Sequence, residues 1–203
     1  MKKYSVIVFD LGNVLIPFDY EPVIEKLNQL KPELGNKFKK LYADNYHIHQ
    51  QFERGELTQE KFIAIMLVWL EGTISQEEFC NLFSNIFTIN HNIVELLPKL
   101  KEKYKLVLLS NTNEMHKHYG YGKFEFLNYF DKLILSYEVG AIKPEEKIYR
   151  TVEQFTQLPS QQHFFIDDIK EYIEGAKKCG WSGAQFAGYE KLTAVLKAEG
   201  IIE

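Results

Sequence analysis

The sequence predicts an α/β fold in which an open, doubly wound parallel sheet carries a large helical insert after its first strand. Five short apolar segments rich in Val, Ile, Leu and Phe are typical of strands covered on both faces. Segments with helical spacing separate the later ones, and this alternation predicts right-handed crossovers. The long interval between the first two apolar segments contains helical patterns but no convincing strand.

The individual elements follow from these patterns. Strands are predicted at 4–9, 105–110, 132–136, 163–166 and 183–187. Between the later strands, helices are predicted at 92–104, 144–155 and 169–180. The last helix closes on Gly180, a residue that suits the left-handed conformation at a helix C-terminus.

Residues 17–88 are predicted to form the helical insert. Apolar residues recur at helical spacing in four segments, 20–30, 35–55, 58–72 and 75–87. Thr58 and Ser75 are expected N-caps, and Ser75 with Glu78 fits a capping box. The predicted organisation is a three-layer Rossmann-like core, residues 1–16 and 89–203, with a helical-bundle cap, residues 17–88, beside the carboxyl end of the first strand. Ligands of such sheets bind at that end.

Composition excludes several classes of protein. The chain has 203 residues, is 45% hydrophobic and carries a net charge of −4, so it can bury a core and lacks the basic surface of a nucleic-acid-binding protein. Cys80 and Cys179 lie far apart without metal-ligand spacing and are expected to be buried thiols. No signal peptide or membrane span is recognised, because Asp10 interrupts the first apolar run. A cytoplasmic protein is expected, with no contact to nucleic acid or membrane.

Polar residues follow each of the first four predicted strands. They are Asp10, Ser110, Lys143 and the pair Asp167 and Asp168. Taken singly, the serine fits a turn, the lysine a loop, and the two acids a cap for the next helix. Parallel strands bring their carboxyl ends to one edge, however, so all five side chains are expected to meet there.

Phosphoryl transfer through an aspartyl-phosphate requires such a set of side chains. A carboxylate nucleophile, Asp10, must approach a phosphate dianion, and a hard cation held by oxygen ligands lowers the repulsion. Magnesium, held by Asp10 and an acid after the fourth strand, meets this requirement. Ser110, nearby backbone N–H groups and Lys143 are candidates to bind the phosphoryl oxygens.

Four segments carry a resemblance to a known family over the whole chain. VIVFDLGNVL, VLLSNTN, AIKPEEKIY and FFIDDIKEYIEGA resemble, in this order, the motifs of the haloacid dehalogenase-like hydrolase superfamily. The insert lies where that family places its helical cap. More narrowly, FDLGNV, FERGEL, LSNTN and the ending IEGA resemble the subgroup that contains bacterial α-D-glucose-1-phosphate phosphatase.

The resemblance implies a role for each matched residue. Asp10 is the expected nucleophile, and Ser110 and Lys143 are expected to hold phosphate. Asn111, directly after the serine, is expected to orient the phosphate-binding loop.

A magnesium site is implied as well. Asp168 is expected as a direct ligand and Asp167 as a ligand through water or as a supporting acid, beside Asp10 and the backbone carbonyl of Gly12. Tyr172 stands where close relatives often have an Asn that supports the metal, which predicts weaker metal binding.

Gly12 departs from the family pattern. Most phosphatases of the superfamily have a second aspartate there that acts as general acid and base, a contribution of roughly 10²–10⁴ in rate. Three explanations for the missing aspartate stay open at this point. The cap or a water molecule supplies the acid, with Glu53, His47 and His49 as candidates. Alternatively, the substrate has an easy leaving group, such as glucose 1-phosphate, or the enzyme is slow. The second is favoured here.

The function predicted is a magnesium-dependent phosphatase for a small phosphorylated metabolite, acting as a monomer or homodimer. One alternative is a 2-haloacid dehalogenase, which needs no acid at Gly12 but would leave Asp167 and Asp168 without a purpose. The other is a module that binds a phosphate ligand with little turnover, which Gly12 and Tyr172 favour.

Remaining polar side chains leave further alternatives. His116 and His118 either line the substrate entrance or are solvated, and a metal site built from these two with His47 and His49 is not required by their spacing. Arg54 either reaches the site or pairs with Glu53 or Glu56. The crossings 16–18 and 88–90 are hinge candidates for cap opening.

Overall fold

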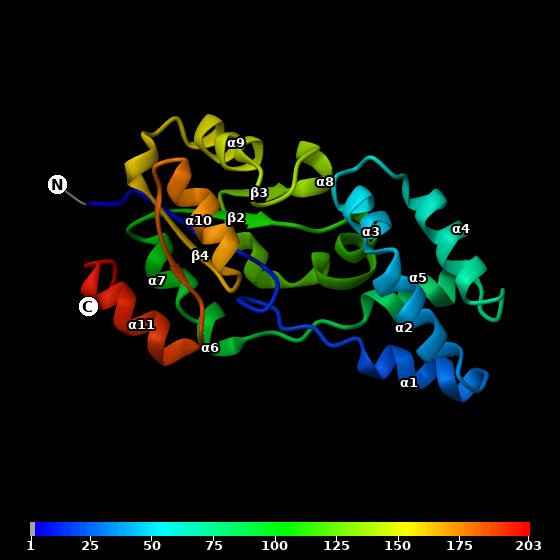
Figure 1. Cartoon of the computed structure of the whole chain (residues 1–203). Coiled ribbons are helices and arrows are strands. Elements are labelled where there is room, and N and C mark those ends of the chain that lie inside the picture. Colours follow the sequence, from blue (N-terminus) through cyan, green and yellow to red (C-terminus); the bar gives the residue numbers. More distant parts are fainter. Residues whose placement is uncertain (1–2) are drawn as a thin grey trace.

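A five-stranded parallel sheet in the order β3-β2-β1-β4-β5 forms the centre of the computed structural model, which describes residues 3–203 (Figure 1). The strands are β1 (Val6–Phe9), β2 (Lys105–Ser110), β3 (Lys132–Leu135), β4 (His163–Asp167) and β5 (Ser182–Gln185). The predicted fold class is confirmed, and every strand lies where its apolar segment predicted it.

The central strand β1 explains why apolar and polar residues do not alternate in these segments. It pairs with β2 on one side and β4 on the other, with Val8 opposite Val107 and Phe165. Ile7 and Phe9 point into one apolar cluster, whereas Val6 and Val8 point into another. Both faces are therefore buried, as is usual for parallel sheets, and both demand apolar residues.

Helices cover the two faces. One face packs against α6 (His91–Val94), α7 (Leu97–Lys101) and α11 (Tyr189–Ala198), and the other against α9 (Glu146–Thr156) and α10 (Lys170–Lys178). A short helix, α8 (Ser136–Val139), follows β3. The single helix predicted at 92–104 is instead two, because Pro98 lacks an N–H donor and is placed in the first turn of α7. The helix α11 was not predicted.

The insert contains five helices, not the four predicted. They are α1 (Glu21–Leu30), α2 (Leu34–Asp44), α3 (Tyr46–Glu53), α4 (Gln59–Trp69) and α5 (Gln76–Ser84). The segment 35–55 divides at Asn45, where φ is −122° and ψ is 32°. Both N-caps are confirmed: Thr58 accepts from a backbone N–H, and Ser75 and Glu78 form the reciprocal capping box. No helix in residues 3–203 has the length and apolar character needed to span a bilayer.

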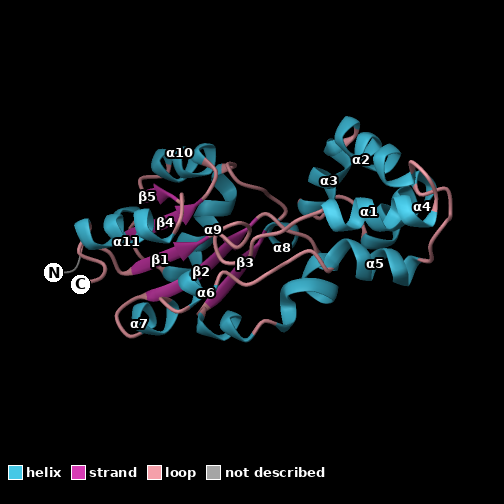
Figure 2. Cartoon of the chain, turned by 90° about the horizontal axis from the view of Figure 1, so that it is seen from below, coloured by secondary structure: helices cyan, strands magenta, loops and turns pink. Residues whose placement is uncertain are grey.

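The insert lies beyond the carboxyl ends of the strands, at the end of the molecule opposite both termini (Figure 2). Its helices enclose an apolar cluster that includes Phe62, Phe79 and Phe83. Met115, from the segment after β2, belongs to the same cluster. On the α5 side, apolar packing thus joins the insert to the segment after β2, and the crossings 16–18 and 88–90 stay predictions as hinges.

The aromatic-rich segment 118–130 packs against the sheet. It forms short irregular turns, a π-helical turn at His116–Gly120 followed by 3₁₀ turns at Tyr121–Lys123 and Glu125–Tyr129. Tyr121, Phe126 and Phe130 are buried in the apolar cluster of that face. The two cysteines are buried and free.

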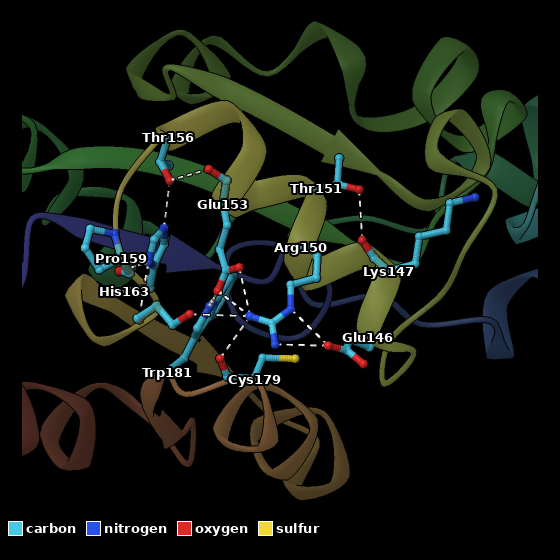
Figure 3. Close-up of polar contacts among 11 residues, drawn as sticks. Glu146, Lys147, Arg150, Thr151, Glu153, Thr156, Pro159, His163, Cys179 and Trp181 are labelled. Carbon is cyan, nitrogen blue, oxygen red and sulfur yellow. Dashed lines mark hydrogen bonds and ion pairs between the residues drawn. The ribbon is translucent and has the colours of Figure 1, made fainter.

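A polar network ties α9 to β4 and to the loop before β5 (Figure 3). Arg150 Nη1 donates to Glu153 Oε2 at 2.9 Å and to the carbonyl of Cys179 at 3.1 Å. Glu153 Oε1 also accepts from the indole Nε1 of Trp181 at 2.8 Å. Burial raises the pKa of Glu153, but these donors outweigh it and the pKa is lowered. The carboxylate therefore contributes stability near neutral pH.

We expect the Glu153→Ala substitution to lower the free energy of unfolding by about 1–3 kcal/mol, because the Trp181 indole loses its acceptor. The matched control is Glu174→Ala, which removes an ion pair of the same spacing with Lys177 on α10. The Glu174 side chain is 49% exposed, against 16% for Glu153. Its loss should cost less than about 0.5 kcal/mol. Urea unfolding at neutral pH measures both, and equal costs would contradict the expectation.

Candidate active site

The carboxyl edge of the sheet brings a buried lysine between two carboxylates. Asp10 follows β1 directly, Asp167 is the last residue of β4, and Lys143 comes from the loop between α8 and α9. Lys143 Nζ donates to Asp10 Oδ1 and to Asp167 Oδ2, both at 2.6 Å. The Lys143 side chain is 1% exposed. The edge thus joins Asp10 to a lysine that lies 133 residues further along the chain.

Asn111 fixes the backbone of Lys143. Its Oδ1 accepts from the Lys143 N–H at 2.7 Å, and its Nδ2 donates to the Lys143 carbonyl at 3.2 Å. The same Nδ2 lies 3.3 Å from the hydroxyl oxygen of Tyr172, whose ring centroid is 5.0 Å from Lys143 Nζ. Asn111 was expected to orient a phosphate-binding loop, and in the structure its side chain holds the lysine. Tyr172 covers that lysine.

Asp168 completes a group of three carboxylates. Ligand atoms from Asp10, Asp167 and Asp168 all lie within 4.8 Å of one another. Asp168 Oδ2 accepts from Asn13 Nδ2 at 3.2 Å, and Asp167 Oδ1 accepts from the N–H of Ile169 at 2.8 Å. The second bond reaches only Ile169, which precedes α10, and no side chain caps that helix, so the alternative interpretation of the two acids as helix caps is wrong.

The charges of this cluster do not balance. Burial raises the pKa of Asp10 to about 7, more than the attraction of Lys143 lowers it, and the carboxylates of Asp167 and Asp168 raise it further. Burial lowers the pKa of Lys143, but its two carboxylate partners outweigh this and raise it. Burial also raises the pKa of Asp168. The cluster therefore holds three carboxylates and one ammonium, and a divalent cation with a preference for oxygen ligands, such as Mg²⁺, fits the surplus of negative charge.

Gly12 lies two residues beyond Asp10 in a tight turn. Its carbonyl oxygen accepts from the N–H of Val14 at 2.6 Å, across Asn13 with φ of 54°. A Cβ at Gly12 would lie 3.3 Å from Phe18 Cε1 and 4.0 Å from Asp10 Oδ2. The role of this carbonyl as a metal ligand stays a prediction. A side chain at this position would need Phe18 to shift.

Ser110 lies at the end of β2, where its buried Oγ donates to the carbonyl of Asn111 at 3.3 Å. The loop that follows is fixed by Ser136, whose Oγ accepts from the Thr112 N–H and donates to the Thr112 carbonyl, both at 2.9 Å. Ser110 and Asn111 both line the cavity next to the carboxylate cluster. Ser110 thus lies at the edge of the site, as its place after the second strand predicted.

A cavity of about 440 Å³ lies between the insert and the sheet. The sheet domain contributes Gly12, Ser110 and Asn111 to its wall, and the insert contributes tyrosine, histidine and glutamate side chains, among them Tyr42, His49 and Glu53. The sequence did not predict Tyr42, on α2, as a residue of the site, because nothing distinguishes it from the other tyrosines of the insert.

The four histidines considered for a metal site are not brought together. His49 and His116 are buried and line the cavity, whereas His47 and His118 are exposed. Within residues 3–203, the three aspartates are the only group of three or more acidic, histidine or cysteine side chains placed to hold a metal. Burial lowers the pKa of His116 to about 3, with a further contribution from His49, so His116 is neutral at physiological pH.

Arg54 pairs with neither of the glutamates expected for it. Its Nε and Nη2 donate to Glu145 Oε1 at 2.9 and 2.7 Å. Glu145 lies two residues after Lys143, so this ion pair joins the insert to the loop that carries the buried lysine. Nothing in the segment PEEKIY indicated which residue Glu145 would contact.

We expect the Asp168→Asn substitution to weaken Mg²⁺ binding at least about tenfold, because it removes one charged oxygen ligand from the cluster. Glu171→Gln, an exposed acid in the first turn of α10, is the matched control and should leave the affinity unchanged. Isothermal titration calorimetry with MgCl₂ measures both. An unchanged affinity in Asp168→Asn would exclude the three-carboxylate site.

Known proteins resemble the chain over most of its length. A D-ribitol-5-phosphate phosphatase of Bacteroides thetaiotaomicron is 27% identical over 190 residues, which cover 88% of this chain and 90% of that protein. A crystal structure of a haloacid dehalogenase family enzyme from the same organism, in complex with magnesium and inorganic phosphate, is 29% identical, with a TM-score of 0.80 over 93% of this chain and 98% of the other.

A more distant structure shares the fold alone. The L-2-haloacid dehalogenase of Xanthobacter autotrophicus is 19% identical, with a TM-score of 0.64 over 100% of this chain and 85% of the other. The family model described as haloacid dehalogenase-like hydrolase matches residues 7–185. The predictions of this family, of a hydrolase and of magnesium as the family's cofactor are confirmed. The chain, with its five-stranded sheet, helical insert and carboxylate cluster, belongs to the haloacid dehalogenase-like hydrolases.

Proposed function

We propose that the protein is a magnesium-dependent phosphatase that hydrolyses the phosphate ester of a small sugar or sugar alcohol through a phosphoaspartate at Asp10. One observation carries the proposal: Asp10, Asp167 and Asp168 cluster around Lys143 next to a cavity of about 440 Å³. A single lysine cannot neutralise three carboxylates together with a phosphate dianion, so the cluster requires a divalent cation.

Each residue of the cluster has a role in this reaction. Asp10 attacks phosphorus, so that a bond from its carboxylate oxygen forms while the bond to the ester oxygen breaks. Lys143 orients Asp10 through the 2.6 Å hydrogen bond and offers positive charge to the transferring phosphoryl group. Asn111 keeps Lys143 in place through its two backbone contacts. Ser110 is placed to bind a phosphoryl oxygen from the end of β2.

Magnesium would be held by Asp10, Asp167 and Asp168, with the Gly12 carbonyl as a further oxygen ligand. When bound, it neutralises charge between the nucleophile and the phosphate. Water then attacks phosphorus of the phosphoaspartate, releases inorganic phosphate and restores Asp10.

The cavity favours a polyhydroxylated substrate. Its wall combines apolar aromatic surface with hydroxyl and imidazole groups from Tyr20, Tyr42, Tyr46, His49 and His116. Such mixed walls bind compounds with an apolar ring or chain and several hydroxyl groups. The similarity to a D-ribitol-5-phosphate phosphatase supports the same class. Glucose 1-phosphate, whose anomeric oxygen leaves readily, is one member of it.

The dehalogenase alternative shares the fold and the nucleophile but not the need for a cation. The three clustered carboxylates of this chain would repel a carboxylate substrate unless a cation were bound, which favours phosphate ester hydrolysis.

The first test measures phosphate release from glucose 1-phosphate, glucose 6-phosphate and ribitol 5-phosphate, with Mg²⁺ and with EDTA. We expect turnover with Mg²⁺ only, because the three aspartates repel the phosphate dianion without it. Asp10→Asn should lose at least about 10³-fold in kcat, since the amide is not a nucleophile. Glu171→Gln is the control and should retain the activity.

Magnesium-independent turnover, or full activity of Asp10→Asn, would contradict the proposal. No turnover of any ester would favour a binding module, and release of chloride from 2-chloropropionate would identify a dehalogenase.

A further inference from the structure

We infer that Glu53 of the insert is the proton donor and acceptor that the sheet domain lacks at Gly12, with His49 and Tyr42 as positioning residues behind it. The inference rests on the proposed function, because it assigns the proton transfers of that same reaction. The sequence left three cap residues as candidates for the general acid, and the inference selects one of them. Such an acid would allow the enzyme to hydrolyse ordinary alkyl phosphates, whose leaving group needs a proton.

The sheet domain offers no carboxylate at the place in question. Gly12 has no side chain, and the space that a Cβ would take is 3.3 Å from the ring of Phe18. Asp10, Asp167 and Asp168 are committed to the nucleophile and the cation site. The proton for the leaving oxygen must therefore come from another wall of the cavity or from solvent.

Two glutamates line the cavity, and they differ in environment. Glu21 is 60% exposed and forms an ion pair with Lys39. The Glu53 side chain is 12% exposed and has no lysine or arginine partner among the ion pairs of residues 3–203. Of the two, only Glu53 is an enclosed carboxylate without a lysine or arginine partner among the described residues.

Glu53 ends a chain of hydrogen bonds within the insert. Its Oε1 lies 3.2 Å from His49 Nε2, four residues earlier on α3, and His49 Nδ1 lies 2.5 Å from the hydroxyl oxygen of Tyr42. A carboxylate oxygen can only accept, so His49 carries its proton on Nε2 and donates a hydrogen bond to Glu53. Nδ1 then accepts from the hydroxyl of Tyr42, whose pKa burial raises well above its usual value.

The next two residues hold Glu53 against the sheet domain. Arg54 binds Glu145 at 2.7 Å, two residues from Lys143. Gly55 has φ of 69°, and a Cβ there would lie 2.4 Å from the carbonyl oxygen of Tyr137, so only glycine permits this approach. The end of α3 is therefore anchored beside the catalytic edge at two points.

The charge of Glu53 also reaches the other wall of the site. Burial raises the pKa of Tyr172, the ammonium of Lys143 lowers it, and the carboxylate of Glu53 raises it again. Tyr172 itself contacts Asn111 at 3.3 Å. Glu53 and three residues of the sheet edge, Gly12, Ser110 and Asn111, line the same cavity.

The proton transfers balance over the two steps. In the first, a protonated Glu53 carboxyl gives its proton to the ester oxygen as the bond from that oxygen to phosphorus breaks and the bond to Asp10 forms, which leaves Glu53 as a carboxylate beside His49 Nε2. In the second, Glu53 takes a proton from the water that attacks phosphorus, and phosphate leaves as Asp10 is restored. One water is consumed, and the alcohol and phosphate are the products.

The test compares two leaving groups in Glu53→Gln. Ribitol 5-phosphate releases an alkoxide that needs a proton, whereas p-nitrophenyl phosphate releases a phenolate that needs none. We expect kcat/KM with Mg²⁺ to fall about 10²–10⁴-fold on the alkyl ester and less than about threefold on the aryl ester. His49→Gln should show the same split with a smaller loss. Glu56→Gln, an exposed acid three residues away, is the matched control and should change neither value.

Two further measurements on Glu53→Gln distinguish structural damage from the loss of proton transfer. The amide oxygen that Glu53→Gln introduces can still accept from His49 Nε2, so the thermal midpoint and the affinity for Mg²⁺ should remain those of the unaltered chain. Equal losses on both esters, or no loss on either, would overturn the role of Glu53 while leaving the phosphatase intact. An unaltered chain that hydrolyses neither ester would instead overturn the proposed function and this inference with it.

Discussion

The buried ammonium of Lys143 between Asp10 and Asp167 is the interaction on which the site depends. Burying a charge is costly unless it is paired and hydrogen-bonded, and here each carboxylate is 2.6 Å from the lysine. The arrangement exists because β1 and β4 are parallel neighbours whose ends coincide. Asn111, at the end of β2, fixes the third partner by binding its backbone. Residues at the ends of three neighbouring strands thus fix the position of the Lys143 ammonium.

The same geometry explains why a cation site and a substrate cavity lie side by side. The lysine compensates only part of the charge of three carboxylates, which leaves a strong preference for a divalent cation at the sheet edge. Next to that edge, the insert lines a cavity with aromatic and imidazole side chains. The sheet domain therefore presents the groups suited to a phosphoryl group, and the insert presents those suited to the remainder of a substrate.

The insert is also held in register with the sheet edge. Met115 joins its apolar cluster on one side, and the ion pair of Arg54 with Glu145 joins α3 to the lysine loop on the other. This double attachment holds the end of α3 beside the sheet edge, as the proposed role of Glu53 requires. Phosphatases of this family usually carry the general acid on the sheet domain. Because Gly12 has no side chain, an acid held in place by the insert would be needed instead.

The sequence by itself determined the fold class, the strand positions and the meeting of Asp10, Ser110, Lys143, Asp167 and Asp168 at one edge. These features follow from local periodicity and from the rule that parallel strands align their carboxyl ends. The tertiary structure decided the rest. His47 and His49 are equivalent in the sequence, yet the orientation of α3 exposes the first and turns the second toward Tyr42 and Glu53. The break at Asn45 and the partner of Arg54 likewise depend on which helix faces which surface, because such contacts join residues distant in the chain and leave no local pattern.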